Sequence, residues 1–167
     1  VIFSQGQWNT TGINNSINLL TLYIIKSNNI LYLDYYNETA TQRFIKINPT
    51  SYYDSWKHYS ITFNNSDKEI KFYINGNLIT PESVGGTSSN NISSSGKICI
   101  GVAEYTNSTK AQYFNGQIKL LKIWNKIRTL SEINHSFTYE TTNNTITNNT
   151  YEVDTLLSFN LSTDYID

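Results

Sequence analysis

Aromatic side chains are the residues of this chain whose chemistry is most suggestive, with 13 Tyr, 7 Phe and 3 Trp among 167 residues. Flat aromatic faces stack on the C–H surfaces of sugar rings, and Asp, Asn and Tyr side chains hydrogen-bond sugar hydroxyls. Tyr32, Asp34 and Tyr36 share one face of a predicted strand, because side chains alternate along a strand. Trp8 lies in a polar segment, which favours an exposed ring. We therefore take Trp8, Tyr32, Asp34 and Tyr36 as the candidate ligand-binding residues.

Two interpretations of these tyrosines remain open. In the first, they line a groove that holds a ligand. In the second, they cover a sheet and keep their hydroxyls in water. The other two tryptophans, Trp56 and Trp124, are predicted to be packing residues.

The carboxylates do not form the pattern of a hydrolase. A retaining glycosidase needs two carboxylates about 5–5.5 Å apart on either side of the scissile bond. Asp67 and Glu69 fall in a predicted hairpin loop, and Glu152 and Asp154 share a strand face without a third carboxylate. We therefore predict no catalytic residues and no enzymatic activity.

Metal and redox chemistry have little support. His58 and His135 are too far apart in the sequence to indicate a zinc site, and Cys99 matches neither of the usual ligand spacings. A single cysteine also excludes an internal disulfide. Because Cys99 lies between Ile98 and Ile100, we predict a small packed thiol.

Size and charge exclude several classes of partner. The net charge is −1, with 12 Lys and Arg against 13 Asp and Glu, and the basic residues are scattered. Nucleic acid is therefore not a predicted partner. The chain has no apolar run near the ~18 residues of a membrane span. The length suits one domain over 1–167. Because the sequence contains no Met, even at position 1, we expect a piece of a longer chain with neighbouring domains.

Alternating apolar and polar residues predict about ten short strands. The Asn75-Gly76 pair predicts a tight hairpin, since both residues tolerate a positive φ. We predict turns or loops at 5–7, 27–29, 81–96 and in the low-complexity segment 141–151. The predicted strands are 1–3, 18–25, 30–36, 43–47, 59–63, 70–74, 77–79, 98–102, 117–124 and 156–161.

One short helix is predicted near 130–137. Thr129 and Glu132 have the spacing of a capping box, in which each side chain accepts from the other residue's backbone N–H. Many strands, one helix and no βαβ rhythm indicate an all-β fold, an antiparallel two-sheet β-sandwich. A parallel β-helix is disfavoured because no repeat of ~20–30 residues occurs.

The stretch from Trp56 to Ile133 resembles the laminin G-like branch of the concanavalin A-like lectin/glucanase superfamily, and the match covers about half of the chain. Each motif alone is weak, but their order is fairly specific. The motifs are Trp56-Lys57-His58, Tyr73-Ile74-Asn75-Gly76, Ile98-Cys99-Ile100-Gly101, Phe114-Asn115-Gly116-Gln117-Ile118 and Leu130-Ser131-Glu132-Ile133.

The resemblance implies a jelly roll of two packed sheets, one of them concave, whose first strands lie upstream or were trimmed. Residues 156–161 are either its closing strand or the first strand of a following repeat. The resemblance also implies a non-catalytic, lectin-like recognition module on an extracellular, cell-surface or virion protein, with a glycan or a cell-surface protein as partner. The alternatives are a structural spacer or protein–protein interaction domain without a pocket, and a glycoside hydrolase. No cofactor is certain. Calcium (Ca2+) is the one that many relatives bind at the sandwich rim, but no acidic cluster assigns its ligands here.

Overall fold

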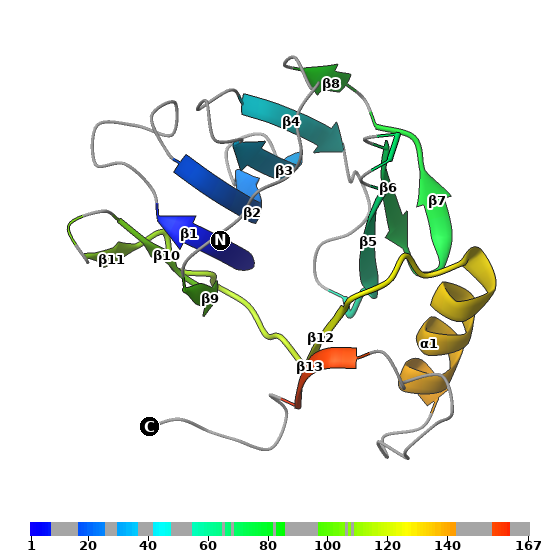
Figure 1. Cartoon of the computed structure of the whole chain (residues 1–167). Coiled ribbons are helices and arrows are strands. Elements are labelled where there is room, and N and C mark those ends of the chain that lie inside the picture. The colour runs from blue at the N-terminus through cyan, green and yellow to red at the C-terminus, as the bar shows by residue number, and fades with distance from the viewer. Residues whose placement is uncertain are drawn as a thin grey trace. The chain divides into compact units, whose positions relative to one another are not determined.

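The computed structural model shows a chain of mostly antiparallel strands with one helix, as predicted (Figure 1). The residues that it describes are 1–7, 17–25, 30–36, 42–47, 55–64, 66, 67, 69–81, 83–85, 97–105, 107, 109–142 and 155–160. The chain divides into two compact units, which are described separately. The first unit comprises Val1–Ser55, Asn65–Lys68 and Thr80–Asn115, and the second comprises Trp56–Asn64, Glu69–Ile79 and Gly116–Asp167.

A six-stranded antiparallel sheet forms the centre of the first unit, in the order β8-β4-β3-β2-β1-β9 (Figure 1). Its strands are β1 (Phe3–Gln7), β2 (Ile17–Ile25), β3 (Ile30–Tyr36), β4 (Gln42–Ile47), β8 (Ser83–Gly85) and β9 (Ile98–Ile100). A small hairpin of β10 (Ala103–Glu104) and β11 (Lys110–Ala111) belongs to the same unit.

One face of this sheet is apolar. Leu22 pairs with Leu33, and Leu31 pairs with Ile47, so these side chains lie on the same face. All are buried, with 1–6% of their surface exposed. Burying an aliphatic side chain of this size contributes about 1.5–3 kcal/mol, so this face drives the pairing of β2, β3 and β4.

The opposite face of the sheet buries a row of polar side chains. Asp34 pairs with Thr21, Thr21 with Ser4, and Ser4 with Cys99 across four neighbouring strands. Their exposed fractions are 1%, 0%, 0% and 9%. The Ser4 hydroxyl donates to the Val102 carbonyl at 3.2 Å, as expected of a buried polar group. The burial of Cys99 confirms the predicted packed thiol.

The structure corrects two sequence-based predictions in the first unit. Residues 5–7 are not a turn but the second half of β1, with a register irregularity between Gln5 and Gln7. Gly6 has a φ of 94°, which glycine adopts without strain because it has no Cβ. The residue therefore forms a bulge within β1, and the strand continues past it. The predicted loop 81–96 contains the short strand β8, and the rest of that loop lies largely outside the described residues.

A three-stranded meander lies in the second unit, made of β5 (Tyr59–Asn64), β6 (Glu69–Ile74) and β7 (Asn77–Ile79). The predicted hairpin at Asn75-Gly76 is confirmed, with φ values of 52° and 77°. The His58 backbone N–H donates to the Asn75 side-chain oxygen at 3.0 Å, and the Asn75 N–H donates to the His58 carbonyl at 2.8 Å. Phe72 is 1% exposed and anchors the meander.

The second unit also holds the strand pair β12 (Leu120–Trp124) and β13 (Thr155–Asn160) and the helix α1 (Leu130–Thr142). The β13 bounds differ by one residue from the predicted closing strand 156–161. The helix is longer than the predicted 130–137, and residues 141 and 142 are helical where a loop was predicted. Low-complexity Thr and Asn content therefore does not stop a helix that has already begun.

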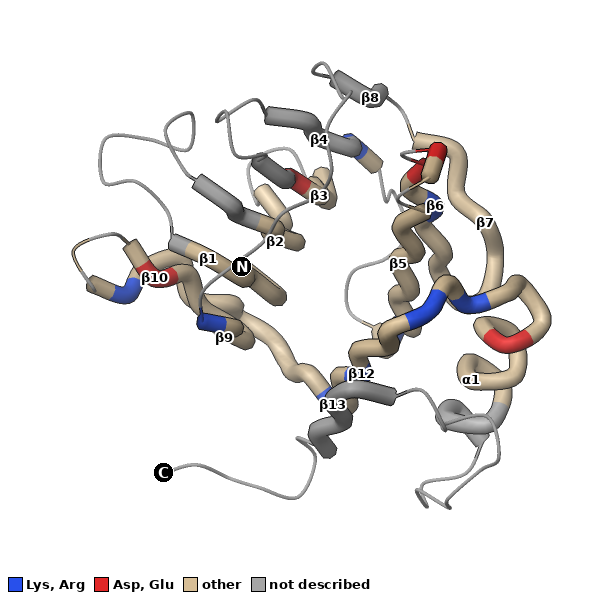
Figure 2. The backbone as a smooth tube through the Cα atoms, in the orientation of Figure 1, with Lys and Arg blue, Asp and Glu red and all other residues tan. Residues whose placement is uncertain are grey.

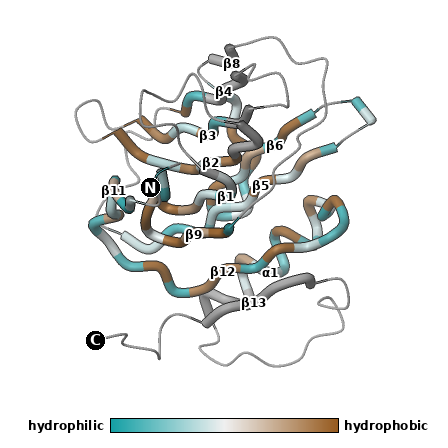
Figure 3. The backbone as a smooth tube through the Cα atoms, turned by 60° about the vertical axis from the view of Figure 1, so that its left-hand side comes forward, coloured by the Kyte–Doolittle hydropathy of each residue, from teal (hydrophilic) through white to brown (hydrophobic). Residues whose placement is uncertain are grey.

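The capping box predicted at the start of α1 is confirmed. The Glu132 N–H donates to Thr129 Oγ1 at 3.2 Å, and the Thr129 N–H donates to Glu132 Oε2 at 2.7 Å. Ile133, on the buried side of the helix, is 3% exposed. Brown and teal segments alternate along α1 in Figure 3, as in an amphipathic helix.

The two tryptophans predicted to pack differ. Trp56 is 62% exposed, so the prediction for Trp56 was wrong, because a motif position does not determine how a side chain is covered. Trp124 is half-buried, and the Arg128 guanidinium lies 4.6 Å from its ring centroid in a cation–π contact.

Candidate functional site

A stacked pair of tyrosines is the main chemical feature on the polar face of the six-stranded sheet. Tyr23 on β2 is the register partner of Tyr32 on β3, which places both rings on one face of the sheet. The ring centroids are 5.3 Å apart and the ring planes differ by 10°. Both side chains are half-buried and so keep part of their surface accessible.

The buried Asp34 side chain fixes the position of Tyr23 in this pair. The Tyr23 hydroxyl donates to Asp34 Oδ2 at 2.8 Å, and Asp34 is 1% exposed. A hydrogen bond to a buried carboxylate fixes the direction of the Tyr23 side chain and with it the plane of the stack. We call the surface made by Tyr23, Tyr32 and Asp34 the tyrosine face.

Neighbouring residues support and border the tyrosine face. Tyr23 packs, together with Tyr105, against the buried Val1 and Ala103. On the other side of the pair, half-buried Lys46 is the register partner of Tyr32. The face thus offers aromatic surface, the Tyr32 hydroxyl and a border ammonium group.

The predicted site residues have different outcomes. The structure brings Tyr32 and Asp34 together through Tyr23, although Asp34 is covered and does not present its side chain to solvent. For Tyr36 only the backbone is described, at the end of β3, and Trp8 lies outside the described residues.

Sequence reasoning placed Tyr23 on a strand but not in the site. The hairpin between β2 and β3 pairs Ile25 with Ile30, which sets Tyr23 opposite Tyr32. The signal was therefore available from the predicted turn at 27–29, because the turn determines the register of the two strands.

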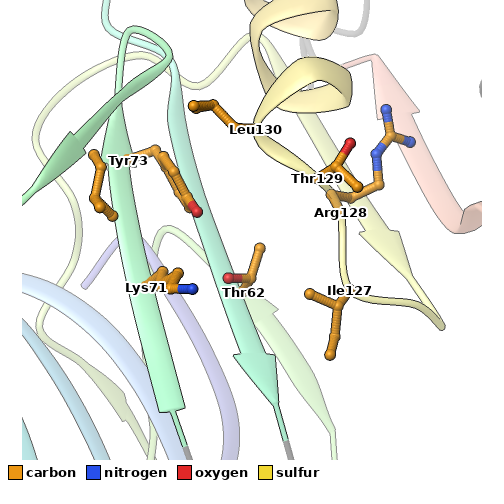
Figure 4. A pocket seen from close by; sticks show the side chains of 8 residues that line it. Thr62, Lys71, Tyr73, Ile127, Arg128, Thr129 and Leu130 are labelled. Carbon is orange, nitrogen blue, oxygen red and sulfur yellow. The ribbon is translucent and has the colours of Figure 1, made fainter.

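A concave feature of different chemistry lies within the second unit. A cavity of about 400 Å³ opens between the β5–β6 hairpin and the start of α1 (Figure 4). Thr62 and Lys71 lie on the strand side, together with Tyr73, and the segment from 127 to 130 forms the other side (Figure 4). We call it the helix-side pocket; its lining residues are Thr62, Lys71, Tyr73, Leu78, Ile127, Arg128, Thr129 and Leu130.

The described part of the chain contains neither a cluster of metal-binding side chains nor a membrane-spanning helix. Among the described residues, no group of three or more His, Cys, Asp and Glu is placed to hold a metal ion. The charged residues are spread along the described tube of each unit and do not gather into a basic stripe (Figure 2). In the same part of the chain, no helix has the length and apolar character needed to span a bilayer.

Comparison with known proteins gives a family match that covers most of the chain. The laminin G-type family model described as "Concanavalin A-like lectin/glucanases superfamily" matches residues 2–134. The chain belongs to this superfamily. Neither the curated proteins nor the solved structures gave a match.

Membership of the concanavalin A-like superfamily confirms the predicted family and fold class. In the part of the chain that the structure describes, the mostly antiparallel strands and the one helix are consistent with a concanavalin A-like sandwich. The match extends the likeness from Trp56–Ile133 to nearly the whole described chain and includes β2 and β3, which carry the tyrosine face. Because the superfamily contains both lectins and glucanases, the match alone does not distinguish sugar binding from hydrolysis.

Proposed function

We propose that this chain is a non-catalytic, lectin-like glycan-recognition module of a larger extracellular or surface protein. The observation that carries the proposal is the stacked Tyr23–Tyr32 pair, anchored by Asp34 on a partly accessible sheet face. Because the two rings cover each other's inner faces, the outer face of Tyr32 is the surface that can stack on the C–H face of a pyranose ring.

The arrangement suits weak, selective binding. The ring planes are held by the sheet and by the hydrogen bond to Asp34, so a ligand loses little affinity to ordering these side chains. The Tyr32 hydroxyl and the Lys46 ammonium lie at the border, where they can hydrogen-bond sugar hydroxyls. We expect a single site of modest affinity, strengthened when several modules act together.

The buried carboxylates of the first unit favour recognition over hydrolysis. Asp34 accepts from Tyr23 at 2.8 Å. Glu104, 4% exposed, accepts from the Lys97 ammonium at 3.2 Å and lies 4.0 Å from Cys99 Sγ. Both carboxylates hold neighbouring side chains in place, whereas a glycosidase needs an acid and a nucleophile facing the substrate.

A glycan array with the full chain, run with and without calcium, tests the proposal. Tyr32→Ala removes half of the stack, and we expect it to abolish the array signal. Tyr113→Ala is the matched control, since Tyr113 is a 71% exposed tyrosine of the same unit outside the face. Unchanged binding by Tyr32→Ala, or equal loss in both variants, would refute the assignment. Release of reducing sugar from any bound glycan would instead support hydrolysis.

A further inference from the structure

The helix-side pocket has a lining that differs in chemistry from the tyrosine face. We propose that it binds a short apolar peptide segment carrying a carboxylate, supplied by a partner protein. This site is independent of glycan recognition, because all its lining residues lie in the second unit.

The rim of the pocket is aliphatic and exposed. Leu78, Ile127 and Leu130 are 56%, 50% and 51% exposed, and all three line the pocket. They are three of the seven large hydrophobic side chains that are exposed in the described part of the chain. Gathering of such side chains around one cavity marks an interaction surface, whereas single exposed leucines do not.

The charged groups of the lining have one sign. Lys71 and Arg128 line the pocket, and no acidic residue does. Lys71 Nζ contacts Glu69 Oε2 at 2.9 Å, with the two side chains 43% and 49% exposed. An ion pair at this exposure is worth little, so an incoming carboxylate can share the Lys71 ammonium at small cost.

Arg128 supplies a fixed positive charge in the wall. Its guanidinium donates to the Glu132 carbonyl and to Ser136 Oγ, each at 3.3 Å, and covers the Trp124 ring. Arg128 is 6% exposed and its Nε lies 3.9 Å from Glu132 Oε2, so it is held in place and its charge is partly offset by that carboxylate. Figure 4 shows the Tyr73 hydroxyl directed toward the side formed by Lys71 and Thr62, where it can donate to the same carboxylate.

The same lining argues against a sugar as the occupant. Its one aromatic residue, Tyr73, is 5% exposed and offers no open ring face. Aliphatic rim residues match aliphatic side chains, and a cavity of about 400 Å³ is large enough for one or two of them. The capping box fixes the start of α1, so the helix side of the pocket is already formed before a peptide binds.

Titration of the ¹⁵N-labelled full chain with acetyl-Leu-Glu-Leu-Leu-amide, followed by amide NMR shifts, tests this proposal. We expect shifts confined to the lining residues. Replacing the peptide's Glu by Gln should weaken binding about two- to fivefold, as should Lys71→Gln in the chain. Leu78→Ser with Leu130→Ser should weaken binding at least about tenfold, because the rim loses its apolar area.

Ile98→Ser is the matched control, since Ile98 is a 39% exposed aliphatic residue of the first unit, and it should leave the affinity unchanged. Urea midpoints verify that each variant is folded. Equal affinity for the Glu and Gln peptides would refute the proposal that the pocket recognises a carboxylate. Unchanged peptide affinity in the Leu78→Ser, Leu130→Ser variant would show that the peptide does not bind in the helix-side pocket. Sedimentation showing a dimer that Leu78→Ser dissociates would make a second copy the occupant and overturn the peptide proposal.

Discussion

Replacing Tyr23 by Phe tests how the tyrosine face is held. The substitution keeps the ring but removes the hydroxyl that donates to Asp34 Oδ2 at 2.8 Å. Asp34 is 1% exposed, so water does not replace the lost donor freely. Hydrogen bonds to charged groups contribute about 1.5–3 kcal/mol, and we expect the free energy of unfolding to fall by that amount.

Urea unfolding measures the loss, and Tyr113→Phe is the control. Tyr113 is 71% exposed, so its hydroxyl should contribute less than about 0.5 kcal/mol. The double variant Tyr23→Phe with Asp34→Asn gives the coupling energy of the pair, which we expect to exceed about 1 kcal/mol. A Tyr23→Phe loss equal to that of Tyr113→Phe, or a coupling energy near zero, would refute the anchoring role of Asp34.

Three further predictions concern the second unit and use the same urea assay. Gly76→Ala should destabilise the chain by about 1–2 kcal/mol, because Gly76 has a φ of 77° that alanine adopts with strain; an unchanged midpoint would contradict the turn. The hydrogen bond from the Thr129 backbone N–H lowers the pKa of Glu132 from 4.5 to about 2. The ionised Glu132 carboxylate therefore stabilises the folded chain fully above pH 4.5, and this contribution is lost as the pH falls through about 2. Glu132→Gln should flatten the loss of stability over this pH range, and an identical pH profile in wild type and variant would exclude the capping role. Phe72→Ala should cost about 3–5 kcal/mol because Phe72 is 1% exposed, whereas Trp56→Ala should cost under about 0.5 kcal/mol because Trp56 is 62% exposed; comparable losses would show that the burial is misassigned.

Much of the strand pattern could be predicted from the sequence because local rules determine it. Alternation located β3 at its observed bounds, and Asn75-Gly76 located the hairpin between β6 and β7. The capping box of Thr129 and Glu132 located the start of α1. Each of these signals acts within a few residues, so no knowledge of tertiary packing was needed.

Features that depend on distant contacts were harder to predict. The β10–β11 hairpin is too short for alternation to reveal, and its strands pair across a loop. The exposure of Trp56 and the burial of Asp34 depend on which segments cover them, which no local pattern reports. The tyrosine face required the register between β2 and β3, and the helix-side pocket required α1 to lie against β5 and β6.

The most direct test of glycan recognition is an intermolecular NOE experiment on the full chain with a sugar taken from the array. If the Tyr23–Tyr32 stack is the platform, the C–H protons of the sugar ring should give NOEs to the ring protons of these two tyrosines, and Tyr32→Ala should remove them. NOEs from the bound sugar only to other side chains, with the two tyrosine rings silent, would contradict the account.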